Sequence, residues 1–126
     1  MTSTTLVGSA ATARTVAPLS AREVSVLREM LEEQRDFRVE QLAQLHRPGA
    51  RGPLSSTDPE IFRSLASGAR AALRDVQAAL WRMEEGRYGV CVACGRPVEM
   101  IRLEILPQVA RCMPCQRAHA SRPSAG

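Results

Sequence analysis

The chain has 126 residues, a formal net charge of +4 and an apolar fraction of 44%, which suits one modest domain. All seventeen basic residues are arginine, and the surplus lies in residues 87–126, which carry six arginines and two glutamates. A bias this mild is far weaker than the dense basic surface of a protein held mainly by phosphates, so the composition disfavours direct DNA binding.

The first eighteen residues are rich in Ser, Thr, Ala and Gly and show no hydrophobic periodicity. This composition predicts a flexible N-terminal tail over 1–18. The segment has neither the charged start of a signal peptide nor an apolar run long enough for a membrane span. We therefore expect a cytoplasmic protein with no membrane partner, in a reducing compartment where clustered cysteines serve as metal ligands or redox groups.

A first long helix is expected over 20–46. Ser20 and Glu23 fit a capping box at its start. Apolar side chains then recur on one side of a 3.6-residue helical wheel, namely Val24, Leu27, Met30, Leu31, Phe37, Leu42 and Leu45. The run RPGARGP, with two prolines and two glycines, ends this pattern near His46.

A second long helix is expected over 58–86. Thr57 and Glu60 fit a second capping box, Pro59 is tolerated in the first turn, and Gly86 suits the C-terminal cap. The apolar positions between them step by threes and fours, which is the pattern of a helix packed lengthwise on another. The two segments predict an antiparallel helical hairpin, or coiled coil, over 19–86 with a tip loop at 47–57.

The four cysteines form two matched pairs. Cys91, Cys94, Cys112 and Cys115 are arranged as C-x2-C, seventeen residues, C-x2-C, which predicts one structural Zn2+ site in a finger over 87–120. Gly95 suits the positive-φ turn that directs backbone amides at sulfur. An iron site with four thiolates remains chemically open, whereas a thioredoxin-like centre would need a C-x2-C that follows a strand.

The residues after Cys115, up to 120, favour a short C-terminal helix. We expect a second flexible tail over 121–126. The expected fold class is thus mainly α, with a helical hairpin followed by a small four-cysteine zinc finger and a short C-terminal helix. Neither a nucleophile nor a general base stands out. Glu84 and Glu85 are adjacent in sequence and do not face each other as an acid–base pair would. We therefore expect neither an enzyme nor a small-molecule substrate.

The run LWRMEEGRYGVCVACGRPVEMIRLEILPQVARCMPCQ resembles the zinc finger of the DksA/TraR family of bacterial transcription regulators. The shared features are EEGRYG before Cys91, the CxxCGRPV knuckle, RLEILP from Arg102 to Pro107, and CxPCQ ending at Gln116. The hairpin agrees with the family's coiled-coil arm in kind. The resemblance implies that RNA polymerase is the partner and that the coiled coil enters the secondary channel of that enzyme.

The expected tip departs from the family. Its best-studied members carry an acidic Asp-x-x-Asp-x-Ala motif there, whereas this loop reads HRPGARGPLSSTDPE. Arg47, Arg51, Asp58 and Glu60 are the candidate partner-binding residues of the tip. Because the acidic motif is absent, the resemblance does not carry over the direction of the effect on transcription.

Two other functions remain open. One is a nucleic-acid-binding zinc ribbon that uses the arginines of the finger, Arg87, Arg96, Arg102, Arg111 and Arg117; its binding would fall steeply with salt. The other is a protein-interaction adaptor with the same fold and no effect on transcription in a reconstituted assay.

Overall fold

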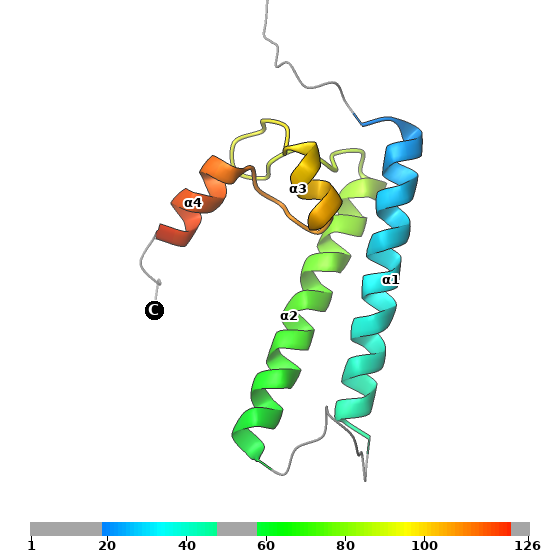
Figure 1. Ribbon diagram of the computed structural model, residues 1–126, viewed down its shortest axis with the longest axis vertical. Coiled ribbons are helices and arrows are strands. Elements are labelled where there is room, and N and C mark those ends of the chain that lie inside the picture. Colours follow the sequence, from blue (N-terminus) through cyan, green and yellow to red (C-terminus); the bar gives the residue numbers. More distant parts are fainter. Residues whose placement is uncertain (1–18, 48–57, 122–126) are drawn as a thin grey trace, which may run out of the picture.

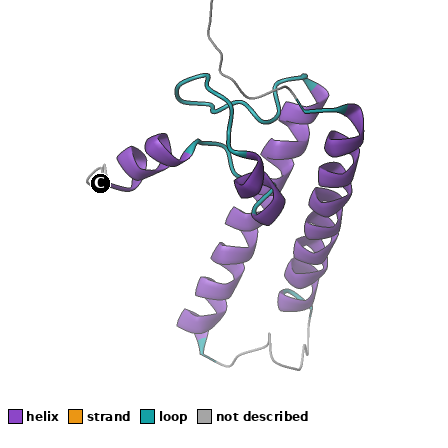
Figure 2. Ribbon diagram, turned by 45° about the horizontal axis from the view of Figure 1, so that its top comes forward, coloured by secondary structure: helices purple, strands orange, loops and turns teal. Residues whose placement is uncertain are grey.

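The computed structural model describes residues 19–47 and 58–121. They form four helices, α1 (Ala21–Leu45), α2 (Pro59–Glu84), α3 (Met100–Ile105) and α4 (Met113–Ser121). α1 and α2 pack lengthwise as an antiparallel hairpin, and α3 and α4 lie near the end where α1 begins and α2 ends (Figure 1). These residues contain no strand and only one isolated antiparallel bridge, between Val90 and Pro97 (Figure 2). The predicted mainly α fold is confirmed.

The predicted tail at 1–18 lies outside the described residues, as do all but the first residue of the predicted tip loop at 47–57 and of the predicted tail at 121–126. Ser121 is the last residue of α4. None of the helices within 19–47 and 58–121 is both long enough and apolar enough to cross a membrane.

The start of α1 is fixed by the predicted capping box. The amide of Glu23 donates to Ser20 Oγ at 3.0 Å, and the amide of Ser20 donates to Glu23 Oε1 at 2.8 Å. The two bonds satisfy backbone donors that the first helical turn leaves without an intrahelical acceptor. α1 ends at Leu45 with His46 as its C-cap, as the glycine- and proline-rich run predicts.

The start of α2 differs from the prediction. Asp58 is the N-cap, and its Oδ1 accepts from the amides of Glu60 at 2.9 Å and Ile61 at 3.4 Å. The expectation of Thr57 in this position is therefore wrong. Both residue types cap well, and the choice of Asp58 places Pro59 at the first helical position, where a missing amide hydrogen costs nothing.

The end of α2 is a Schellman turn. Gly86 has φ +75, its amide donates to the carbonyl of Met83 at 3.1 Å, and the amide of Arg87 donates to the carbonyl of Arg82 at 3.0 Å. This left-handed conformation strains any residue with a side chain but is open to glycine. The turn sends the chain back across the hairpin toward the cysteines.

One continuous core joins the hairpin to the finger. Leu27 and Leu31 of α1 pack with Val76, Ala79 and Met83 of α2, and the same cluster continues into the finger through Cys91, Val98, Leu103 and Cys112. Burying these side chains contributes roughly 25 cal/mol per Å² of apolar surface. The finger is therefore packed onto the stalk instead of being tethered to it.

Phe37 is an exception to the predicted apolar stripe of the first helix. Its side chain is 60% exposed, and the Arg38 guanidinium lies 5.2 Å from the ring centre. Ten residues after Leu27, an α-helix has turned about 80° away from the buried seam. The expectation that Phe37 belongs to the core face is wrong.

Candidate metal centre

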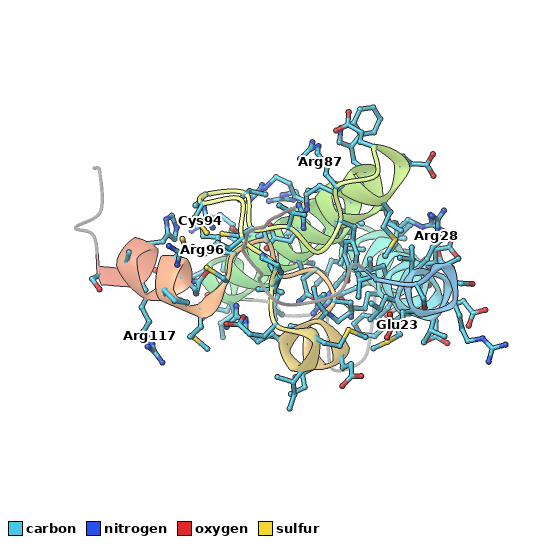
Figure 3. The ribbon with its side chains drawn as sticks, turned by 90° about the horizontal axis from the view of Figure 1, so that it is seen from above. Glu23, Arg28, Arg87, Cys94, Arg96 and Arg117 are labelled. Carbon is cyan, nitrogen blue, oxygen red and sulfur yellow. The ribbon has the colours of Figure 1, made fainter. Side chains whose placement is uncertain are left out.

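The four cysteines come from two separate turns. Cys91 and Cys94 lie in the loop after α2, whereas Cys112 directly precedes α4 and Cys115 lies in its first turn. Figure 3 views the molecule along the hairpin and shows Cys94 and Arg96 on the side toward α4, away from Glu23 and Arg28 of α1. The seventeen intervening residues, including α3, bring the second pair back to the first.

The sulfur geometry fits a single metal ion. All four Sγ atoms lie within 4.8 Å of one another, and those of Cys94 and Cys112 are 3.7 Å apart. Zinc–sulfur bonds of about 2.3 Å in a tetrahedron place the sulfurs about 3.8 Å from one another. Thiolates are also the donors that zinc prefers in closed structural sites. The four cysteines are positioned to hold one metal ion.

Backbone amides support the sulfurs. The amide of Ala93 donates to Cys91 Sγ at 3.4 Å, and the amide of Arg96 donates to Cys94 Sγ at 3.4 Å. Gly95 has φ +80, which turns the chain so that the next amide reaches the sulfur, as its position after Cys94 predicts. Such N–H···S bonds orient metal ligands and stabilise their negative charge.

The pKa values of Cys91, Cys112 and Cys115 are shifted in different directions. Burial acts to raise the pKa of Cys91, but hydrogen bonds from the amides of Cys112, Ala93 and Cys94 outweigh it and lower this pKa to about 6. Hydrogen bonds with the Cys112 and Cys94 side chains raise the pKa of Cys115 to about 12. Hydrogen bonds from Cys115 act to lower the pKa of Cys112, but burial and the hydrogen bonds with the Cys94 and Cys91 side chains raise it overall. Four thiolates in so small a space therefore require a cation to neutralise them.

Two arginines hold the second pair of cysteines in place. Arg82 Nη2 of α2 donates to the carbonyl of Val109 at 3.4 Å, and Arg102 Nη2 of α3 donates to the carbonyl of Arg111 at 3.1 Å. Arg102 Nη1 also contacts Met113 Sδ at 3.3 Å. Sequence reasoning missed the role of Arg82. The side chain of Arg102 is committed to this support and does not belong to a free basic face.

The loop between the pairs is closed by Tyr88 and by backbone bonds. The Tyr88 hydroxyl donates to the carbonyl of Pro107 at 2.8 Å, and burial of the ring raises the pKa of Tyr88 to about 12. The amide of Val92 donates to the carbonyl of Ala110 at 2.9 Å. The first knuckle is thus tied directly to the segment that leads into the second.

Of the candidate tip residues, Arg47, Asp58 and Glu60 lie where α1 ends and α2 begins. This is the end of the hairpin opposite α3 and α4 (Figure 1). Arg47 is exposed, with Nη2 3.9 Å from Glu40 Oε2. The Asp58 carboxylate caps α2, and the amide of Glu60 is one of its donors, so Asp58 has a structural role. Arg51 lies outside the described residues.

Comparison with known proteins agrees with this arrangement. Residues 86–119 match the sequence model of the prokaryotic DksA/TraR C4-type zinc finger. The chain is 33% identical over 64 residues to an uncharacterized protein of Aquifex aeolicus, covering 51% of this chain and 43% of that protein. It is 31% identical over 68 residues to the RNA polymerase-binding transcription factor DksA of Caulobacter vibrioides, covering 54% and 48%. The chain thus matches just under half the length of each of these relatives.

Solved structures show the same fold. The Chlamydia trachomatis RNA polymerase binding protein and transcriptional regulator superposes with a TM-score of 0.61 at 19% identity, covering 86% of this chain and all of that one. The DnaK suppressor protein of Agrobacterium tumefaciens superposes with a TM-score of 0.61 at 23% identity, covering 82% and 99%.

A helical hairpin packed on four clustered cysteines defines a C4 zinc-finger protein of mainly α fold. The sequence match of residues 86–119 and the shared fold point to the same group of proteins. Residues 86–119 form a zinc finger of the DksA/TraR type, and the chain shares the fold of these solved structures.

Proposed function

We propose that Cys91, Cys94, Cys112 and Cys115 ligate one structural Zn2+ in this chain. The sulfur spacing and the supporting N–H···S bonds carry this assignment. A site with four protein ligands has no open position for a substrate or an activated water, so the metal stabilises the fold and takes no part in chemistry. Metal analysis of the purified protein tests it, with one zinc per chain expected, and also distinguishes zinc from iron.

We also propose that the protein is a cytoplasmic transcription regulator that binds RNA polymerase through its hairpin. The observation that carries the proposal is the stalk, because helices of 25 and 26 residues extend for roughly 40 Å from a finger of DksA/TraR type. The Caulobacter relative is named as an RNA polymerase-binding factor. A narrow rod of this length can reach a recessed surface that a globular domain of equal mass cannot.

In this proposal the tip of the hairpin makes the contact that lies deepest within RNA polymerase. Arg47, Arg51 and Glu60 are the proposed contact residues, and Asp58 caps the start of α2. An acidic tip can act on a metal-containing active site through its carboxylates, whereas a tip bearing arginines offers cations. We therefore propose polymerase binding without assigning activation or inhibition.

Retention of purified core RNA polymerase on the immobilised protein tests this function. We expect retention at low salt, weaker retention for Arg47→Ala/Arg51→Ala, and altered transcript yield in a reconstituted reaction. Retention without any effect on transcription would favour the adaptor instead. Failure to retain polymerase, together with strongly salt-dependent binding to oligonucleotides, would favour the nucleic-acid ribbon.

A further inference from the structure

One outer face of α2 carries an unusual row of side chains. Arg63, Arg70, Arg74 and Trp81 are all exposed, and the last three follow the first by 7, 11 and 18 residues. At about 3.6 residues per turn, all four fall within roughly 40° of one another around the helix. We name these four residues the arginine stripe.

The stripe lies away from the core. Ala69, Val76 and Met83, which are buried, follow Arg63 by 6, 13 and 20 residues and therefore occupy the opposite half of the helical wheel. Trp81 is 59% exposed and is the single tryptophan of the chain. The stripe thus combines an exposed indole with three guanidiniums, two residue types that are enriched at interface hot spots.

Within the described residues, the three guanidiniums of the stripe have neither a hydrogen bond nor an ion pair, in contrast to nearby charges. Glu84 lies 3.5 Å from Arg28 of α1, and the carboxylate of Glu85 is bonded to Arg87. Asp75, the remaining acid in the middle of α2, lies about 120° around the helix from the stripe and lines the same cavity as Arg82. The stripe therefore presents positive charge that the described fold does not neutralise.

The outer face of α1 has the opposite charge. Glu29, Glu33, Asp36 and Glu40 are exposed and recur at intervals of 4, 3 and 4 residues, which places them in one row. This row also lies opposite the buried side chains of its own helix, Leu27 and Leu31. The hairpin is thus acidic along one outer side and basic along the other.

This charge distribution favours a protein partner over a nucleic acid. Residues 19–86, the predicted hairpin, contain ten arginines and eleven acidic residues, a net charge of −1 (10 − 11). A body of net negative charge is poorly held by a polyanion, whereas a protein surface can offer carboxylates to the stripe alone. Pairing between the two rows of two copies would rely on exposed ion pairs, which are too weak to offset the entropy lost on association.

We propose that the arginine stripe docks on a carboxylate-bearing protein surface of RNA polymerase, with Trp81 as the apolar anchor at its end nearest the finger. This inference rests on the proposed polymerase association and specifies which face of the rod makes contact and with what chemistry. The acidic row of α1 then faces away from that surface and disfavours the reversed orientation through like-charge repulsion.

A matched pair of charge reversals tests the stripe. The chain has no lysine, so an amine-reactive dye labels the α-amino group alone, and fluorescence anisotropy gives the Kd for core polymerase. We expect Arg70→Glu/Arg74→Glu to raise this Kd on the order of tenfold or more. Arg22→Glu/Arg117→Glu makes the same charge change at exposed sites on α1 and α4 and should alter it less than about threefold. Zinc content and helical circular dichroism should equal those of the wild type in both.

A zero-length crosslink identifies the contacted chemistry. Carbodiimide joins an amine to a carboxylate, so Arg74→Lys should form crosslinks to Asp or Glu of polymerase, whereas Arg22→Lys should not. The stripe proposal is overturned if the two double variants weaken binding equally, if the stripe variant binds as tightly as the wild type, or if crosslinks form equally from both positions. These outcomes leave polymerase binding itself intact. Absence of wild-type binding overturns both proposals, and stripe-dependent binding to an oligonucleotide or to a second copy overturns the assigned partner.

Discussion

Arg82 of α2 donates a hydrogen bond to the carbonyl oxygen of Val109, 27 residues further along the chain. Arg82 is only 6% exposed, and burial lowers the pKa of its guanidinium. The contact joins the hairpin to the segment that enters Cys112. The orientation of the stalk relative to the cysteines therefore depends on a buried cation as well as on apolar packing.

Replacing Arg82 by methionine should loosen this joint. Arg82→Met keeps an unbranched apolar stem but leaves the Val109 carbonyl without its donor, which should lower the free energy of unfolding by about 1 to 3 kcal/mol. Denaturant unfolding measures this change, and faster zinc loss to a chelator should accompany it. Arg74→Met, at an exposed position of the same helix, should change stability by less than about 0.5 kcal/mol. Equal effects of the two variants would show that the joint contributes nothing.

Cys112→Ser should separate the finger from the hairpin. The variant lacks one of the four sulfurs, so we expect zinc binding to fail and amide protection in residues 87–120 to be lost, because metal binding and folding of such modules are coupled. Much of the helical circular dichroism should remain, since α1 and α2 have their own packed seam. Wild-type protein treated with a chelator is the matched control and should give the same spectrum. A variant that keeps full metal content would refute the assignment of this ligand.

Replacing Gly68 or Gly86 by alanine should change the stability of the protein in opposite directions. Gly68 lies inside α2 with nothing within 4 Å of an added Cβ, so Gly68→Ala should stabilise the protein by roughly 0.5 to 1 kcal/mol. Gly86 has equal space but φ +75, so Gly86→Ala should destabilise it by about 1 kcal/mol or more. Thermal unfolding compares the two. A gain at both positions would mean that the Schellman turn does not constrain the backbone.

Tyr88 should make the protein lose stability at alkaline pH. Its pKa rises from 10.0 to about 12 on folding, so the folded chain retains a proton that the unfolded chain releases. The resulting stabilisation is complete below pH 10 and declines as the pH rises toward 12. Tyr88→Phe should cost about 1 kcal/mol at pH 8 through loss of the Pro107 bond and should show a shallower decline above pH 10. Urea unfolding at pH 8 and pH 11 measures both effects, and parallel declines for the two proteins would contradict this role of Tyr88.

The features that sequence predicts well are those fixed by neighbours within a few residues. The Ser20–Glu23 box, the left-handed Gly86 and the positive φ of Gly95 each follow from a local rule about backbone donors or sterics. The cysteine pairs could be predicted for a related reason, because two short knuckles and a tetrahedral ion constrain each other strongly.

The features that could not be predicted from the sequence depend on how the finger packs on α2 or on small differences in angle around a helix axis. Arg82 and Val109 meet only because the finger folds back on α2, and no periodicity in either segment indicates this contact. The spacing of Phe37 predicts a place on the core face of α1. Gln34, which is only about 20° around the helix from Leu27, lies half-buried on that face instead. Asp58 and Thr57 have nearly equal capping preference, so the backbone geometry had to decide between them.

Native mass spectrometry of the protein, purified without added metal, tests most directly whether one zinc held by four thiolates closes the finger that packs on the stalk. We expect a single zinc per chain, with all four cysteines protected from alkylation until a chelator is added. A metal-free chain whose cysteines react freely while its finger amides stay protected from exchange would contradict it.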